Sequence, residues 1–154
     1  MKTQILSGLL AMLIITSGCL KDTSCQFKTV ASEDAEMQSY AVSNGMSVTQ
    51  HSSGMYYQII NPGSGAVPNY NSILSVKYTG KLMNGTVFDS RTATPVLLQL
   101  GGVITGWQLG LQLIQKGGII KLIIPSSLAY GCQPNGPIPG NSILYFEIEL
   151  VDVQ

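Results

Sequence analysis

Charge is scarce in this sequence, and neither sign dominates. Lys and Arg number 8, Asp and Glu also number 8, and charged residues make up 10% of the 154 positions. Binding to nucleic acid requires a concentrated basic surface that contacts the phosphates. The composition therefore predicts no nucleic-acid partner, and it does not suggest a strongly acidic substrate.

Histidine and cysteine are scarce as well, which limits the chemistry open to the protein. The single histidine, His51, forms no convincing arrangement with Ser and Asp, or with Cys, for nucleophilic catalysis. The three cysteines show no metal-ligand spacing. We expect no metal and no other cofactor. Cys25 and Cys132 could form a disulfide in an oxidising compartment or remain free thiols, and the sequence leaves both alternatives open.

No hydrophobic run reaches the roughly 20 residues that a membrane-spanning helix requires. The apolar run Ile5 to Ile15 follows Lys2, is interrupted only by Ser7 and Gly8, and precedes small residues. This arrangement is typical of a secretory signal peptide, which we assign to residues 1–18.

The end of this segment, Ser17-Gly18-Cys19, resembles a bacterial lipobox, in which cleavage leaves a lipid on the cysteine. Thr16 departs from the Leu that is usual three positions before that cysteine. An ordinary signal peptide and an uncleaved anchor are the alternatives. We expect an exported protein of the bacterial cell envelope, attached through Cys19 to a membrane, at the outer membrane or the periplasmic face.

The segment 19–53 is expected to be a lipid-anchored tether followed by a short helical extension. Residues 20–31 show no hydrophobic period and are interpreted as the tether. Ser32 is followed by three acidic residues within four positions, which indicates a capped helix start. This helix should end before Ser43–Gly45.

Hydrophobic residues make up 45% of the chain, enough for a core, and their periods predict an α+β domain. Strands are expected in the segments 55–60, 73–82, 86–90, 119–125 and 143–150. Asn84-Gly85 predicts a hairpin with a type I′ turn, which needs positive φ at both residues. Ile104, Trp107, Leu111 and Ile114 lie at helical spacing and predict one amphipathic helix, ended by Gly117-Gly118.

Four ordered blocks between residues 54 and 154 also resemble a known family. They read VKYTGKLMNGTVFDS, LQLGGVITGWQLGLQLIQKGG, IPSSLAYG and IPGNSILYFEIELVDV. These blocks resemble the signatures of the FKBP-type peptidyl-prolyl cis/trans isomerases. The resemblance implies a twisted antiparallel β-sheet wrapped around one short central helix, with residues 54–154 forming the isomerase domain.

The resemblance also implies an aromatic pocket that binds proline-containing polypeptides. Macrolide FKBP ligands could enter the same pocket. By motif, the catalytic residues would be Tyr78, Asp89 and Tyr130. The substrate-binding residues would be Phe88, Val103, Ile104, Trp107, Ile138 and Phe146. Trp107 would form the floor, the Ile104 N–H and the Tyr130 hydroxyl would donate to substrate carbonyls, and Asp89 would orient its neighbours. The implied function is assistance to the folding of exported proteins.

Alternatives to this interpretation remain open. On periodicity alone, the aromatic residues of this set could simply be core. Val96 stands after Pro95 where many members have an aromatic residue, which implies a less aromatic pocket wall. A non-catalytic proline-binding or chaperone-like adaptor with the same pocket is the alternative function. The sequence implies no particular oligomeric state.

Overall fold

The computed structural model describes residues 25–154. The expected signal peptide and the lipid site at Cys19 therefore lie outside the described residues. Within the described part, no helix is both long and apolar enough to cross a membrane.

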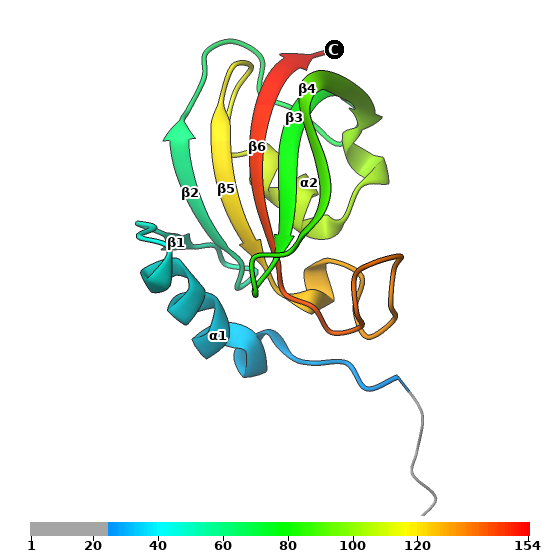
Figure 1. The fold of residues 1–154 in the computed structure, drawn as a ribbon. Helices are drawn as coiled ribbons and strands as arrows, with labels where there is room; N and C mark the ends of the chain where they lie inside the picture. Colours follow the sequence, from blue (N-terminus) through cyan, green and yellow to red (C-terminus); the bar gives the residue numbers. More distant parts are fainter. Residues whose placement is uncertain (1–24) are drawn as a thin grey trace, which may run out of the picture.

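Six antiparallel strands form one twisted sheet in the order β1-β2-β5-β6-β3-β4. The strands are β1 (Thr49–Gln50), β2 (Tyr56–Asn61), β3 (Ile73–Leu82), β4 (Val87–Gln99), β5 (Ile119–Ile124) and β6 (Leu144–Val153). The helices are α1 (Val30–Ser43) and α2 (Thr105–Leu111), with short 3-10 turns at Leu100–Gly102 (η1) and Ser126–Leu128 (η2). This architecture confirms the expected α+β class (Figure 1).

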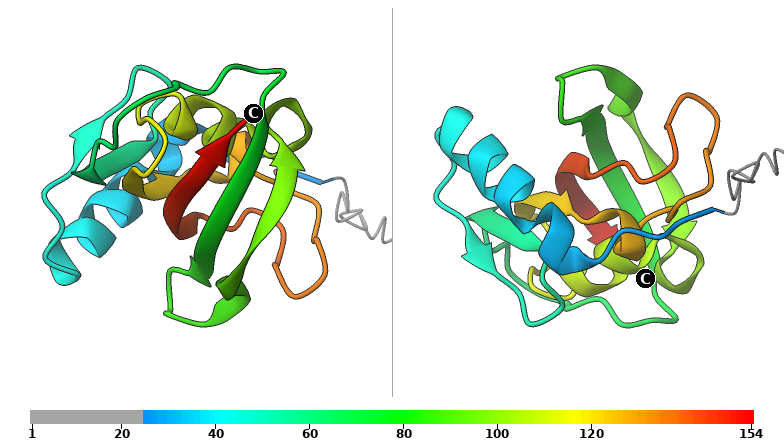
Figure 2. Two further views of the ribbon diagram at one scale, coloured as in Figure 1. Left: turned by 90° about the horizontal axis from the view of Figure 1, so that it is seen from above. Right: turned by 90° about the horizontal axis from the view of Figure 1, so that it is seen from below.

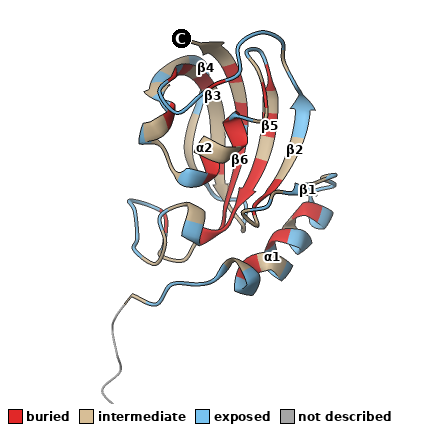
Figure 3. Cartoon of the chain, turned by 180° about the vertical axis from the view of Figure 1, so that it is seen from behind, coloured by how far each residue is buried: buried red, intermediate tan, exposed pale blue. Residues whose placement is uncertain are grey.

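The main core lies between α2 and one face of the sheet (Figure 3). Strand β6 illustrates this arrangement, because Leu144, Phe146, Ile148 and Leu150 share one face of the strand and are all buried, as expected. Helix α2 can approach β5 closely because Gly106 and Gly110 carry no Cβ. A Cβ at these positions would lie 2.4 Å and 2.6 Å from side-chain atoms of Ile124 and Leu122.

Helix α1 lies against the opposite face of the sheet (Figure 2). A second apolar cluster lies beneath it. Met37 and Ala41 of α1 pack there with Tyr56, Ile123 and Tyr145. Ile123 and Tyr145 fall between residues of the main core, so the period of two places them on the other face. The N-terminal extension thus belongs to the packed domain, and the sheet is covered on both faces.

Several boundaries differ from the expectation. Helix α1 begins at Val30, with Thr29 rather than Ser32 as the N-cap; the Thr29 side chain accepts a hydrogen bond from the Ser32 N–H. Helix α2 ends at Leu111, before the expected Ile114. The strand expected over 86–90 starts at Val87 and continues to Gln99 as β4.

The hairpin between β3 and β4 is confirmed, but its expected turn type is wrong. Gly85 has a φ of 88°, whereas Asn84 does not have a positive φ. The Leu82 N–H donates to the Thr86 carbonyl, so the connection is wider than a two-residue type I′ turn. The Asn84 side chain accepts from the Thr86 N–H at 3.0 Å, which stabilises this wider turn.

The expected tether is also wrong for the residues that the structure describes. Val30 and Ala31 belong to α1, and Cys25 forms a disulfide with Cys132, with 5.5 Å between the Cα atoms. The structure thereby decides the alternative that the sequence left open, in favour of the pair over free thiols.

Candidate functional site

A cavity of about 260 Å³ opens between α2, the strands β3, β4 and β6, and the loop after β5. Most of its lining is apolar. The lining residues are Tyr78, Phe88, Asp89, Leu98, Gly102, Val103, Ile104, Trp107, Tyr130 and Phe146. A cavity of this kind can hold an apolar ring while polar groups at its edge contact what is attached to the ring.

Trp107 is one of the residues that line the cavity. Its side chain, on α2, is 4% exposed, and its ring makes edge contacts with Tyr78 and Phe146, at 5.1 Å between ring centroids in both cases. Phe88 continues the aromatic wall, with its ring 5.5 Å from that of Phe146. The Trp107 Nε1 is buried and has no hydrogen-bond partner among the described residues.

Gly80 allows this aromatic wall to form. It lies on β3 opposite Asp89 of β4 and Phe146 of β6. A Cβ on Gly80 would lie 2.6 Å from the Phe88 ring and 2.7 Å from the Phe146 ring. The glycine of the Tyr-Thr-Gly motif therefore leaves the space that both phenylalanine rings occupy.

A polar pair lies on the β3–β4 side of the cavity. The Tyr78 hydroxyl donates to the Asp89 carboxylate at 2.5 Å. The other carboxylate oxygen of Asp89 accepts from the Ser90 N–H at 2.8 Å and lies 3.6 Å from Arg91. Burial, and then the hydrogen bond to Asp89, raise the pKa of Tyr78 to about 12. Tyr78 is thus a neutral donor that orients the carboxylate.

Two further donors lie at the mouth of the cavity. Ile104 directly precedes α2, and its N–H has no acceptor among the described residues. Tyr130 lies in the loop after β5, is 40% exposed, and its hydroxyl has no hydrogen-bond partner in the described part of the chain. Both groups can donate to carbonyl oxygens on a bound molecule.

The structure brings together all but one of the residues named from the sequence. Ile138 instead lines a neighbouring cavity of about 290 Å³, which shares Phe88, Asp89 and Tyr130 with the main cavity. Sequence reasoning missed Leu98 and Gly102, which line the main cavity. Val96 packs against the main core and is not among the lining residues, whereas Leu98 is. The period of two along β4 could have indicated Leu98, two residues after Val96.

Comparison with known families and relatives gives a consistent result. Residues 65–151 match the family described as FKBP-type peptidyl-prolyl cis-trans isomerase. The isomerase FkpA of Buchnera aphidicola from Schizaphis graminum is 46% identical over 121 residues, which cover 77% of this chain and 47% of the relative. FkpA of Escherichia coli is 43% identical over 109 residues, which cover 70% of this chain and 40% of the relative. The chain thus spans about half the length of the curated relatives that it matches.

Solved structures show the same fold. The crystal structure of FkpA from Escherichia coli superposes with a TM-score of 0.70 at 39% identity, covering 81% of this chain and 61% of that one. A peptidyl-prolyl cis-trans isomerase from Pseudomonas syringae pv. tomato superposes with a TM-score of 0.69 at 34% identity, covering 84% of this chain and 98% of that one.

Proposed function

Since this chain belongs to the family of FKBP-type peptidyl-prolyl cis-trans isomerases, we propose that it catalyses cis-trans isomerisation of X–Pro bonds in polypeptides. The observation that carries the proposal is the apolar cavity above Trp107, with two unpaired donors at its mouth. A proline ring suits the cavity because it is compact and apolar. The carbonyls that flank the ring are acceptors for the donors.

The reaction needs little from the protein beyond this binding. Rotation about the X–Pro bond has a barrier of roughly 18–20 kcal/mol because amide resonance must be lost. No covalent bond is broken, so no nucleophile takes part. The planar amide is more polar than the twisted amide, so a water-poor cavity favours the twisted form. An acceleration of about a thousandfold requires only about 4 kcal/mol, which desolvation and one or two hydrogen bonds can supply.

Each residue has a role in this mechanism. The proline ring lies on the face of Trp107, between Phe88 and Phe146. The Ile104 N–H and the Tyr130 hydroxyl donate to the two carbonyls beside the twisting bond. Asp89, fixed by the Tyr78 hydroxyl, orients the edge of the cavity without exchanging protons. Ile138 contacts the chain beyond the proline through the neighbouring cavity.

The test is the rate of exchange between the cis and trans forms of the peptide Ala-Leu-Pro-Phe, measured by NMR with catalytic amounts of the full-length chain. Exchange should be faster than for the peptide alone. Trp107→Leu and Tyr130→Phe should each reduce the acceleration by about tenfold or more, since each removes one contact to the twisted state. Leu97→Ala, at a 67% exposed position of β4 outside the cavity, is the control and should leave it unchanged.

An uncatalysed rate in a folded wild-type chain would contradict the enzyme proposal. It would leave the alternative, a non-catalytic proline-binding or chaperone-like adaptor with the same pocket. Macrolides that bind FKBP pockets are proposed to occupy the same cavity, so they should compete with the peptide.

We further propose that the protein is exported and attached to a membrane of the cell envelope, where it assists the folding of exported proteins. The disulfide between Cys25 and Cys132 supports an oxidising compartment. The signal peptide and the lipid on Cys19 remain proposals from the sequence. Cys19→Ala should release the protein from the membrane fraction; a variant that still sediments with membranes would contradict the lipid anchor.

A further inference from the structure

The loop that carries Tyr130 has little support of its own. From Pro125 to Asn141 it contains one 3-10 turn and an isolated bridge between Asn135 and Ile138, and it belongs to no strand. A hydrogen-bond donor contributes more to binding when its position is fixed before the substrate arrives, because less ordering is then required on binding. The contacts that hold this loop therefore bear on the proposed site.

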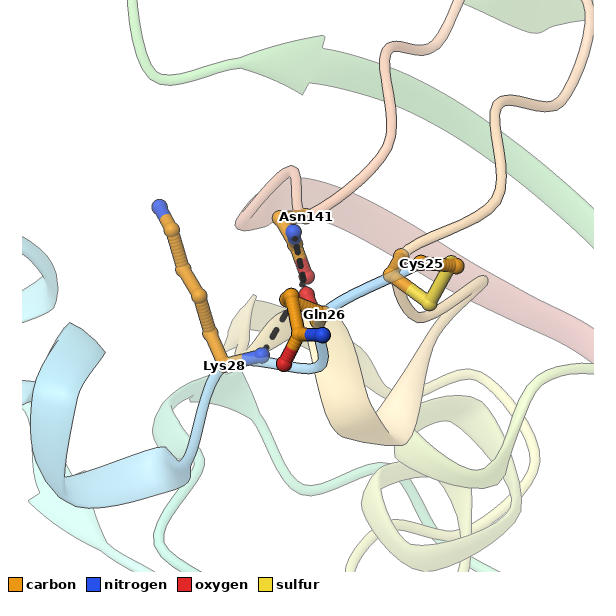
Figure 4. Close-up of a disulfide and its surroundings, with 5 residues drawn as sticks. Cys25, Gln26, Lys28 and Asn141 are labelled. Atoms are coloured by element: carbon orange, nitrogen blue, oxygen red, sulfur yellow. Dashed lines mark hydrogen bonds between the residues drawn. A yellow bond between two sulfur atoms is a disulfide. The ribbon is translucent and has the colours of Figure 1, made fainter. Parts of the chain in front are cut away.

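The N-terminal segment Cys25–Glu33, which lies outside the family match at 65–151, supplies such contacts. The disulfide joins Cys25 to Cys132, two residues after Tyr130. The Asn141 side chain accepts from the Lys28 N–H at 3.3 Å and donates to the Gln26 carbonyl at 2.8 Å (Figure 4). The Asn141 N–H in turn donates to the Gly131 carbonyl at 2.7 Å. These contacts attach the end of the loop.

Glu33 attaches the beginning of the loop. Its side chain is 1% exposed, and its Oε2 accepts from the Ser126 N–H at 2.8 Å. The Ser126 carbonyl accepts from the N–H groups of both Ala129 and Gly131, at 3.0 Å and 2.8 Å. These two residues flank Tyr130, so a continuous series of bonds runs from the Glu33 carboxylate to the backbone on both sides of Tyr130.

The burial of this carboxylate calls for a reason beyond attachment of α1. Taking a carboxylate out of water is costly unless its oxygens are bonded. The Glu33 Oε2 accepts one hydrogen bond, from the Ser126 N–H, and the Oε1 lies 4.0 Å from the Lys28 Nζ. The Oε1 and the Ser126 Oγ are buried without hydrogen-bond partners among the described residues. Helix α1 is already held to the sheet by the apolar cluster around Met37 and by the hydrogen bond from Tyr56 to Asp34.

We propose that Glu33 is a positioning residue for Tyr130: its buried carboxylate fixes Ser126, and through Ser126 the two peptide groups that flank the tyrosine. The inference rests on the proposed isomerase function, in which Tyr130 donates to the substrate. It extends the site to a helix outside the family match.

The test is a double-mutant cycle with Glu33→Met and Tyr130→Phe in the full-length chain. Methionine is close to glutamate in length and removes the acceptor, and because the Lys28 side chain is 46% exposed, the change leaves no buried charge unpaired. In the Tyr130 background, Glu33→Met should slow exchange of the Ala-Leu-Pro-Phe peptide by about tenfold, the size expected for one misplaced donor. In the Tyr130→Phe background the same change should cost less than about twofold, because the hydroxyl is absent.

Two further variants test whether the slower exchange in Glu33→Met comes from loss of the hydrogen-bond acceptor. Glu33→Gln retains an acceptor for the Ser126 N–H and should stay within about threefold of the wild type. Glu36→Ala removes an exposed carboxylate of the same helix and should leave the rate unchanged. Equal losses from Glu33→Met in both tyrosine backgrounds, or no loss in a folded variant, overturn the inference. A Glu33→Gln variant as impaired as Glu33→Met also overturns it.

Amide hydrogen exchange gives a readout that needs no enzyme activity. The Gly131 N–H, which donates to the Ser126 carbonyl, should exchange at least about tenfold faster in Glu33→Met than in the wild type. In Glu36→Ala its exchange rate should be unchanged. An unchanged rate for Gly131 in Glu33→Met overturns the inference even if the wild type proves inactive. An inactive wild type with the expected change at Gly131 contradicts the proposed function alone.

Discussion

The burial of Tyr78, together with its hydrogen bond to Asp89, predicts how stability changes at alkaline pH. The pKa of Tyr78 rises from 10.0 to about 12 on folding, so the folded state favours the protonated phenol. The contribution of the protonated Tyr78 side chain to stability is therefore fully present below pH 10, and it is lost as the pH rises from about 10 to about 12. In urea unfolding, the difference in unfolding free energy between the wild type and Tyr78→Phe should shrink over this interval. A difference that stays constant from pH 8 to pH 12 would contradict this assignment.

Gly80 predicts a second effect of a single residue. Gly80→Ala places a Cβ within 2.7 Å of the Phe88 and Phe146 rings, so both must move and the cavity wall is distorted. We expect a loss of about 1–3 kcal/mol in the free energy of unfolding, typical of overpacking, together with slower peptide exchange. Gly102→Ala is the stability control, because a Cβ there meets no atom within 4 Å. Equal stability of the two variants would show that the wall tolerates the methyl group.

At the scale of elements, the packing of α1 on the sheet is directly testable. Met37 of α1 is fully buried against the sheet, whereas Val42 on the same helix is 80% exposed. Met37→Ala should lower the free energy of unfolding by about 2–5 kcal/mol, and Val42→Ala by less than about 0.5 kcal/mol. Chemical denaturation measures both. Similar small losses would mean that α1 contributes little to the core.

The sequence predicted the type of most elements correctly but several of their ends incorrectly, for local physical reasons. The turns after Leu111 bury Ile114 to 1% exposure, and its spacing from Leu111 fits a helix as well as it fits these turns. Apolar spacing alone cannot distinguish them. At α1, both Thr29 and Ser32 have side chains suited to an N-cap, and the acidic run after Ser32 favoured the wrong one.

The family resemblance is confirmed, and motifs placed eight of the nine expected pocket residues on the main cavity. What they could not predict is the attachment of the loop around Tyr130. Glu33 and Ser126 are 93 residues apart, and Asn141 and Gln26 are 115 apart. Contacts over such distances leave no local period or spacing in the sequence, so residues 20–31 resembled a tether.

At the scale of the whole molecule, the disulfide encloses most of the described chain. Cys25 and Cys132 are 107 residues apart. Closing a loop of this size restricts the unfolded chain and should stabilise the fold by about 4–5 kcal/mol in the chain-entropy description. Urea unfolding of the wild type with and without reductant measures this difference. The double variant Cys25→Ser, Cys132→Ser is the control and should not respond to reductant; a similar response in both would assign the effect to another cause.

The strand order has a consequence for how the chain acquires its structure. Strand β6 is the last strand along the chain, yet it lies inside the sheet and pairs with both β5 and β3. A polypeptide that crosses a membrane from its N-terminus presents β1 to β5 first, as two separate groups of strands with no partner between them. Until Leu144–Val153 has emerged, β3 and β5 each expose an unpaired edge, the kind of surface on which chains aggregate. A protein proposed to assist the folding of exported chains would thus, during its own export, pass through a stage in which it is itself vulnerable to misfolding.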